Sequence, residues 1–171
     1  MSAAEFILGL VTLQRAGELV LSHYNTRRLK ARGAVEVAGG HYSLMVAVHA
    51  AWLIALWVFG HDHPINIIAL SLYLALQALR FWVMRTLGPR WTTRIIVLPE
   101  APLVSAGPYR FLSHPNYAVV IGEIAVLPLV LGLPELAVIF TILNAGVLMI
   151  RIRAENRALA ASRELTPRIA P

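Results

Sequence analysis

Apolar residues run in five long stretches along the chain, and the segments between them carry most of the charged positions. The stretches fall at about residues 3–24, 41–60, 65–86, 115–132 and 135–152. Each is close to the roughly 20 residues that a helix needs to cross the hydrocarbon core of a bilayer. In lipid, a single chain satisfies its backbone hydrogen bonds as helices or as a closed barrel. The pattern therefore predicts an all-α, polytopic membrane helix bundle with about five transmembrane helices.

The composition agrees with this class of protein. Of the 171 residues, 58% are hydrophobic and only 14% are charged, and the mean hydropathy is +0.67. Five spans use nearly the whole chain, so we expect one integral membrane domain over residues 1–171. The first stretch has no basic leader and is expected to be a retained span. The chain contains no cysteine, which excludes disulfides and thiolate ligands, and we expect no metal site.

The basic residues lie on one side of this five-span topology. The formal charge of +6 and the sequence pI of about 10.5 also occur in nucleic-acid-binding proteins, but here Lys and Arg stand at the ends of apolar stretches. All of them except Arg15 and Arg80 lie in the first and third connections or in the tail. Cytoplasmic segments are rich in Lys and Arg. We therefore expect an N-out, C-in orientation and no nucleic-acid partner.

Polar residues inside the spans form a second pattern. Counted from the cytoplasmic ends at 1.5 Å per residue, these side chains lie at depths of about 7–14 Å. Ionisable groups at such depth are costly unless they are paired or face a wet cavity. The layer indicates a pocket open towards the cytoplasm, whereas the alternative for each residue alone is hydrogen-bonded packing between helices. Its members are Arg15, Glu18, His49, Gln77, Arg80, Glu123 and Asn144.

The third connection has about 30 residues, and long ordered connections are commonly functional. It leads into the fourth span through His114-Pro115-Asn116-Tyr117. Pro115 suits the first helical turn, where its missing N–H costs nothing. His114 and Tyr117 would flank the free N–H groups of the helix start, which favour a carboxylate or another electronegative group. The structural alternative is an interfacial aromatic belt and cap.

The segment after the third connection predicts a C-terminal helical hairpin, in which Gly132-Leu133-Pro134 joins the fourth and fifth spans. The fifth helix is expected to continue past the membrane into a cytoplasmic tail. Arg151 and Glu155 are four residues apart there and share one helix face. Taken alone, they indicate an ordinary surface ion pair.

The run LVSAGPYRFLSHPNY, followed by the hairpin and then RIRAEN, resembles the isoprenylcysteine carboxyl methyltransferase family of integral membrane methyltransferases. That family has a glycine and a tyrosine ahead of Arg-His-Pro-x-Tyr, then a helical hairpin, then Arg-Ile-x-x-Glu-Glu-x-x-Leu. The resemblance covers residues 87–159. Ser113 replaces the motif arginine and Asn156 replaces the second glutamate. The N-terminal half is similar to a bacterial branch that includes methylases of phenolic lipids and alkylpyrones.

The resemblance implies an S-adenosylmethionine-dependent O-methyltransferase in the bacterial inner membrane, with its active site facing the cytoplasm. Its acceptor would be a membrane lipid or lipidated substrate, with a prenylcysteine-type carboxylate or a phenolic or pyrone hydroxyl. Residues 87–159 would form the cofactor-binding and catalytic half. The catalytic candidates are Arg151, which would face the acceptor, and Glu155, which would also contact the cofactor. The other positions that match cofactor-binding residues are Leu103, Val104, Tyr109, His114, Pro115, Asn116 and Tyr117.

Other functions stay open at this point. Phospholipid amine methyltransferases and NADPH-dependent isoprenoid or sterol reductases have similar topologies. The GxGxxG pattern is absent, but a site of another fold could bind either cofactor. A non-enzymatic membrane scaffold could use the basic connections to contact anionic lipid. In that case neither Arg151 nor Glu155 would be needed for function.

Overall fold

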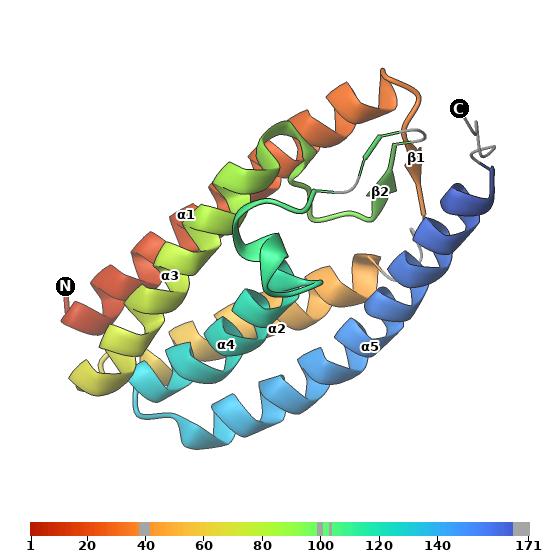
Figure 1. Ribbon diagram of the computed structural model, residues 1–171. Helices are drawn as coiled ribbons and strands as arrows, with labels where there is room; N and C mark the ends of the chain where they lie inside the picture. The colour runs from red at the N-terminus through yellow and green to blue at the C-terminus, as the bar shows by residue number, and fades with distance from the viewer. Residues whose placement is uncertain (38–41, 99–100, 103, 166–171) are drawn as a thin grey trace.

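The computed structural model describes residues 1–37, 42–98, 101–102 and 104–165, and for residues 158–165 it describes the backbone only. The described chain is an elongated bundle of helices (Figure 1). The helices are α1 (Ala3–Lys30), α2 (Tyr42–Gly60), α3 (Ile67–Leu87), α4 (Pro115–Val130) and α5 (Pro134–Leu165). A mostly helical bundle agrees with the predicted class.

Membrane-spanning character is strongest in three of the helices. The segments Tyr42–Gly60, Ile67–Arg90 and Pro134–Arg157 are long and apolar enough to cross a bilayer, judged by length and composition. Helix α4 is apolar but has only 16 residues. Helix α1 is long, but polar residues near its middle lower its hydropathy. The count of five spans and the N-out, C-in orientation stay predictions.

Helix α1 is longer than the first apolar stretch. It begins with a capping box, in which the Ser2 hydroxyl accepts the Glu5 N–H at 3.0 Å and the Glu5 carboxylate accepts the Ser2 N–H at 2.7 Å. It continues past the predicted end at residue 24 to Lys30, because three basic side chains in its last turn stabilise the negative end of the helix. Gly33, at a φ of +85°, then reverses the chain.

One end of the bundle is closed by apolar packing and short turns, and we call it the closed end. The predicted hairpin is present there, with Gly132 at a φ of +68° between α4 and α5. The backbone N–H of Asn66 donates to Val130 O at 2.9 Å, which joins the α2–α3 connection to the hairpin. The core of this end is built from large apolar side chains with no more than 2% exposure, namely Leu8, Trp52, Leu56, Ile124, Leu127 and Leu131.

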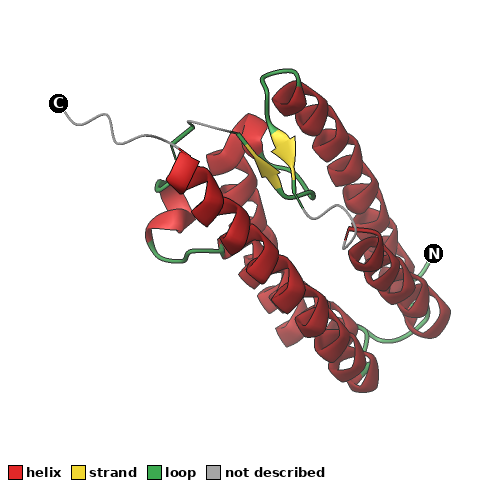
Figure 2. Ribbon diagram, turned by 90° about the vertical axis from the view of Figure 1, so that its right-hand side faces the viewer, coloured by secondary structure: helices red, strands yellow, loops and turns green. Residues whose placement is uncertain are grey.

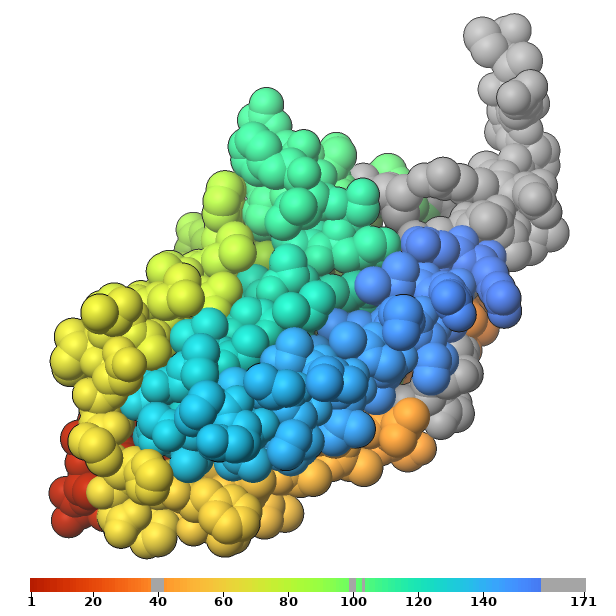
Figure 3. Space-filling view, turned by 90° about the horizontal axis from the view of Figure 1, so that it is seen from below, coloured from red at the N-terminus to blue at the C-terminus, as the bar shows by residue number. Residues whose placement is uncertain are grey.

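Helices α3 and α4 pack closely at a glycine of α4. Helix α4 lies between α3 and α5, and α5 also runs beside α2, as the space-filling view shows (Figure 3). At Gly122 of α4, a Cβ atom would come within 2.7 Å of a methyl carbon of Leu76 on α3. Close backbone approach at small residues is the usual way in which membrane helices associate.

The other end of the bundle carries the long connection between α3 and α4, and we call it the open end. The connection contains two 3₁₀ turns, η2 (Gly88–Arg90) and η3 (Gly107–Arg110), and the strand β2 (Ile96–Val97). This strand pairs antiparallel with β1 (Val35–Glu36), with Val35 opposite Val97. The two strands lie between the ends of α1 and α5 in both ribbon views (Figures 1 and 2). The all-α prediction missed this small sheet, because two-residue strands have no periodicity of their own.

Candidate active site

A cavity of 960 Å³ extends from the open end into the middle of the bundle. Its volume lies at the upper end of the range for small-molecule and cofactor sites, about 300–1,000 Å³. Towards the open end it is lined by Tyr109, His114, Asn116, Tyr117 and Glu155. Deeper in the bundle it is lined by Thr12, Arg15, His49, Trp52 and Arg80. The cavity is therefore shared by the catalytic half suggested by the motif and by the two N-terminal helices.

The entrance of α4 brings two predicted site residues together. His114 is the N-cap residue and Pro115 occupies the first turn, as predicted. The backbone N–H groups of Tyr117 and Ala118 donate to His114 O at 3.1 and 3.2 Å. The rings of His114 and Tyr117 stack, with their centroids 5.4 Å apart. The stacked pair forms one wall of the cavity beside the helix start.

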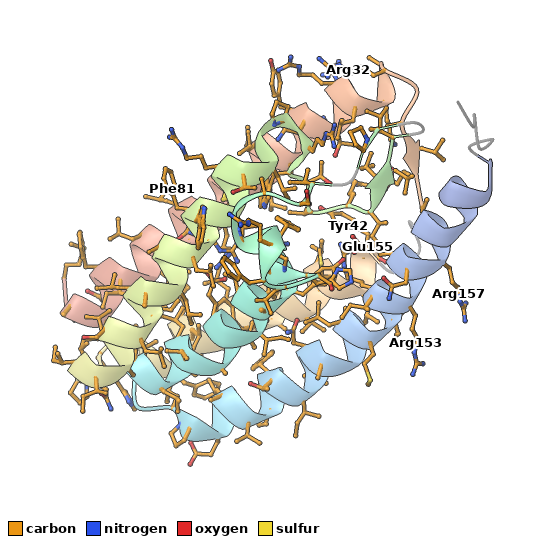
Figure 4. The ribbon with its side chains drawn as sticks, viewed as in Figure 1. Arg32, Tyr42, Phe81, Arg153, Glu155 and Arg157 are labelled. Atoms are coloured by element: carbon orange, nitrogen blue, oxygen red, sulfur yellow. The ribbon has the colours of Figure 1, made fainter. Side chains whose placement is uncertain are left out.

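Glu155 reaches this wall from α5. The Tyr117 hydroxyl donates a hydrogen bond to the Glu155 carboxylate, and His114 Nδ1 lies 4.0 Å from Glu155 Oε2. Glu155 points inward from α5, whereas Arg153 and Arg157 on the same helix point away from the bundle (Figure 4). The side chain is 28% exposed. Its carboxylate can thus accept further hydrogen bonds from a ligand in the cavity.

Arg151 lies one turn deeper on the same face of α5. It is only 5% exposed, and its Nη2 donates to Thr93 O at 2.9 Å. Its guanidinium carbon stands 5.9 Å from the centroid of the Tyr117 ring. No ion pair joins it to Glu155 or to any other acid in the described part of the chain. The interpretation of Arg151 and Glu155 as a surface ion pair is therefore wrong, because Arg151 is buried and both side chains line the cavity.

Thr93, whose carbonyl accepts from Arg151, is held in place by hydrogen bonds to α1. The sequence did not predict this contact. The Thr93 N–H donates to the Ser22 hydroxyl at 2.9 Å, and the hydroxyls of Thr93 and Ser22 are 2.7 Å apart. Asn25, one turn further along α1, donates to Trp91 O at 2.8 Å. Ser22 and Asn25 are both 3% exposed. The position of Arg151 thus depends on two small polar residues of α1, and nothing in the local sequence distinguishes them from surface residues.

The remaining predicted residues divide into three groups. Val104, Tyr109 and Asn116 line the cavity. Pro115 is buried at the start of α4 and does not line the cavity, and Leu103 lies outside the described residues.

Burial and the charge of Glu155 raise the pKa of Tyr109 to about 12, so its hydroxyl stays protonated at neutral pH and can donate a hydrogen bond.

The two departures from the family motif have different surroundings. Ser113, in place of the motif arginine, lines the cavity beside His114. Asn156, in place of the second glutamate, is exposed on α5 and does not line the cavity. Of the two, only the change at Ser113 alters the wall of the site.

The predicted polar layer forms a buried charge network in the middle of the bundle. Arg80 donates through Nε to Glu123 at 2.6 Å and through Nη1 to Glu18 at 3.0 Å. Arg15 donates to Glu18 at 2.8 Å and to Glu123 at 2.9 Å, and Gln77 donates to Glu123 at 2.7 Å. The network joins α1, α3 and α4, and its two arginines balance its two glutamates. Paired charges of this kind are the form in which ionisable groups are tolerated in a membrane.

Both predicted roles of this layer occur, but in different residues. Arg15, Glu18, His49 and Arg80 line the cavity. Glu123 and Gln77 are not among the lining residues: Glu123 accepts from Arg15 and Arg80, and Gln77 donates to Glu123. Asn144 on α5 is also buried and lies off the cavity. The pocket therefore has a charged floor that is supported by interhelical hydrogen bonds.

A second polar cluster holds the small sheet at the open end. Glu36 of β1 accepts from Lys30 at 2.6 Å and also from Arg94, and these two cations lower its pKa. The Arg94 guanidinium lies 4.2 Å from the centroid of the Tyr42 ring. The branched residues around Val35 and Ile96 were the available sequence signal for these strands. Through these contacts the sheet attaches the loop that contains Thr93 to the end of α1 and the start of α2.

Comparison with known proteins shows the family to which the chain belongs. Residues 68–161 match the isoprenylcysteine carboxyl methyltransferase (ICMT) family. An uncharacterized protein of Bacillus subtilis (strain 168), YpbQ, is 35% identical over 158 residues, which cover 90% of this chain and 94% of YpbQ. An uncharacterized protein of Haemophilus influenzae (strain ATCC 51907 / DSM 11121 / KW20 / Rd) is 24% identical over 148 residues, with 83% and 86% of the two chains covered. No solved structure gives a significant match. With its helical bundle and a family match over more than half of its length, the chain belongs to the isoprenylcysteine carboxyl methyltransferase family, a family of methyltransferases.

Proposed function

We propose that this protein is an S-adenosylmethionine-dependent O-methyltransferase that acts on a lipidic acceptor dissolved in the membrane. The observation that carries the proposal is the meeting of Glu155 with Tyr117 and His114 in one cavity that also contains the buried Arg151. Membership in a methyltransferase family supports the reaction class. Residues 87–159 then supply the cofactor site and the catalytic groups within a single membrane domain.

The residues of the open end fit this cofactor. S-adenosylmethionine supplies an electrophilic methyl group on a sulfonium. The Glu155 carboxylate is partly exposed and suits a hydroxyl or ammonium group, while the protonated Tyr109 hydroxyl is a donor. The stacked rings of His114 and Tyr117 offer an aromatic wall, and Val104 an apolar contact. The family resemblance adds Leu103, Pro115 and Asn116 to the cofactor-binding set.

Arg151 would orient the acceptor. It is a buried cation with no acidic partner in the described residues, and a buried charge of this kind calls for an anion. A carboxylate or the oxyanion of a hydroxyl acceptor would satisfy it. Holding donor and acceptor in line at about 3–3.5 Å and excluding water would account for much of the rate. A cationic amine acceptor, as in phospholipid amine methylation, would be repelled by Arg151, Arg15 and Arg80.

The lipid tail would enter sideways between α1 and α2. Leu19 and Val46 both line the cavity, yet they are 47% and 37% exposed. Leu19 begins the short apolar run Leu19-Val20-Leu21 and Val46 lies in the apolar helix α2, so this mouth of the cavity would face the hydrocarbon region of a bilayer in the proposed topology. The basic connections at the open end would face the cytoplasm, where the soluble cofactor is available. This arrangement supports placement in a bacterial inner membrane.

The test is transfer of a labelled methyl group to lipid. The purified protein in lipid nanodiscs is incubated with S-adenosylmethionine carrying a labelled methyl group and with a total lipid extract. The organic phase is then analysed for a labelled species heavier by one methylene unit. Wild type should label one lipid class, and Arg151→Gln should lose most of this activity.

The matched control is Arg153→Gln, because Arg153 is an exposed arginine that points away from the bundle (Figure 4). It should retain wild-type transfer. Equal transfer by the Arg151 and Arg153 variants would remove Arg151 from the acceptor site. The absence of any labelled lipid with folded wild type would contradict the proposed function and revive the scaffold hypothesis.

A further inference from the structure

A histidine of α2 faces the deep part of the cavity. Met45, His49, Trp52 and Leu56 recur at spacings of four, three and four residues, which places them on one face of the helix. Trp52 and Leu56 of this face are buried in the core, so the face points into the bundle. Met45, His49 and Trp52 all line the cavity. His49 is therefore an inward-facing, half-buried residue at the level where α2 leaves the apolar core.

The hydrogen bonding of His49 defines which ring nitrogen carries a proton. Its Nδ1 lies 2.8 Å from Met45 O in the preceding turn. A carbonyl oxygen can only accept, so Nδ1 must be the N–H donor. In the neutral ring, Nε2 then has a free lone pair. None of the hydrogen bonds found among the described residues uses Nε2, so this atom is free to accept a proton from a ligand.

Charged groups from three other helices surround this position. Arg15 of α1, Arg80 of α3 and Arg151 of α5 are close enough to His49 to act on it by their charge. The acids facing the same region are Glu18 of α1 and Glu123 of α4, and both are held by Arg15 and Arg80. Arg151 has no such acid in the described chain. An oxyanion formed beside His49 would therefore be stabilised by fixed positive charge.

We propose that His49 is the proton acceptor for a hydroxyl-bearing methyl acceptor, a lipid phenol or enol. This inference rests on the proposed function and assigns the acceptor class for the same cavity. The acceptor O–H proton passes to His49 Nε2, and the oxygen forms a bond to the methyl carbon of the sulfonium donor. The carbon–sulfur bond breaks and its electron pair stays on sulfur, which becomes a neutral thioether. His49 later releases the proton to water, so one proton is produced per methyl transferred.

The other histidine of the cavity is less suited to this task. His114 stacks on Tyr117 and its Nδ1 faces Glu155, so it belongs to the group of residues proposed for the cofactor. His49 lies deeper, on a helix outside the matched residues 68–161. A carboxylate acceptor would need no base at all. A free histidine lone pair among arginines therefore favours a hydroxyl over a carboxylate acceptor.

The first experiment needs no cofactor. An alkyl nitrophenol is bound to the protein in nanodiscs, and the absorbance of its phenolate is followed as a function of pH. With wild type, the bound probe should ionise at a lower pH than in empty nanodiscs. In His49→Gln the probe should ionise at a higher pH than in wild type, since glutamine keeps a donor for Met45 O but accepts no proton. The part of the shift that comes from the charges of Arg15, Arg80 and Arg151 should remain. The matched control is His23→Gln, an exposed histidine of α1, which should behave as wild type.

The second experiment measures methyl transfer to two amphiphiles, a pentadecyl phenol and a farnesylated N-acetylcysteine. At neutral pH, His49→Gln should lower kcat for the phenol by about 10²–10⁴-fold, the usual contribution of a positioned base. The loss should shrink at alkaline pH, where the phenol ionises by itself. Affinity for S-adenosylmethionine should be unchanged, which also shows that the variant is folded. His49→Asn is a second variant with the same expected outcome.

The outcomes separate this inference from the proposed function. Transfer to the carboxylate alone would leave the methyltransferase intact and overturn the role of His49. Equal probe ionisation and equal pH profiles in wild type and His49→Gln would overturn it as well. If wild type transfers no methyl group to any acceptor, the proposed function fails, while the cofactor-free ionisation of the probe still decides whether His49 accepts the proton.

Discussion

The closed and open ends of the bundle are held together by different forces. At the closed end, Leu56 and Leu131 are completely buried among other apolar side chains, and the connections are short turns. At the open end, Arg151, Thr93 and Ser22 are joined by directional hydrogen bonds across three segments of the chain. Apolar packing fixes how the helices pair, whereas directional bonds fix where single atoms stand. The first end should therefore tolerate conservative apolar substitutions, and the second should not tolerate changes of polar geometry.

The charge network lies between the two ends, and its disruption should have the largest effect on stability. Arg80→Ala leaves Glu123 and Glu18 with a single shared arginine inside the bundle. Removing one member of a buried ion-pair network costs about 3–5 kcal/mol. Thermal unfolding in detergent should show this loss, while Arg85→Ala, an exposed position on the same helix, should be close to neutral. A loss below about 1 kcal/mol would show that the network does not hold the helices together.

Truncation at the closed end should reduce stability without affecting chemistry. Leu56→Ala removes a fully buried side chain from the core. We expect a loss of about 2 kcal/mol, the low end of the range for buried leucines, because lipid replaces water around the separated helices. Val58→Ala on the exposed face of α2 is the matched control. If Leu56→Ala lowers cofactor affinity at a temperature where the protein stays folded, the closed end is not separate in function from the open end.

Removing a hydrogen bond at the open end should weaken cofactor binding and leave stability nearly unchanged. Tyr117→Phe removes one hydrogen bond to the Glu155 carboxylate. Hydrogen bonds to charged groups contribute about 1.5–3 kcal/mol, but Glu155 is partly exposed and water can replace the hydroxyl. The dissociation constant for S-adenosylmethionine should rise about tenfold with little change in Tm. Tyr24→Phe, at an exposed tyrosine, should change neither quantity. A large fall in Tm with unchanged affinity would make Tyr117 a packing residue.

The smallest expected effect concerns the sheet at the open end. Lys30 and Arg94 lower the pKa of Glu36 below its ordinary value of 4.5. A lowered carboxyl pKa contributes stability that is present above pH 4.5 and is lost as the pH falls through the folded-state value. Glu36→Gln should therefore cost less than about 1 kcal/mol at neutral pH, and the difference from wild type should vanish in acid. A difference that persists below the folded-state pKa would contradict the ion-pair explanation.

The sequence predicted the parts of this protein that depend on local or short-range physics. The lengths of the apolar stretches predicted the helices, and Gly132 with Pro134 predicted the hairpin between α4 and α5. The spacing of Arg151 and Glu155 correctly put both side chains on one face of α5. Their contacts could not be derived in this way, because Tyr117 and Thr93 reach them from distant parts of the chain. The contacts of α1 were the least predictable, since Ser22 acts only through a loop whose path is fixed by tertiary structure.

The most direct test of the central claim is calorimetric titration of the protein in nanodiscs with S-adenosylmethionine. If the entrance of α4 and the extension of α5 form the cofactor site, wild type should bind at one site per chain. Glu155→Gln should weaken binding by about 10–100-fold, the loss expected for hydrogen bonds to a charged group. Glu135→Gln, at an exposed glutamate in the first turn of α5, should leave binding unchanged. Wild-type affinity in folded Glu155→Gln, or no binding by folded wild type, would contradict the account.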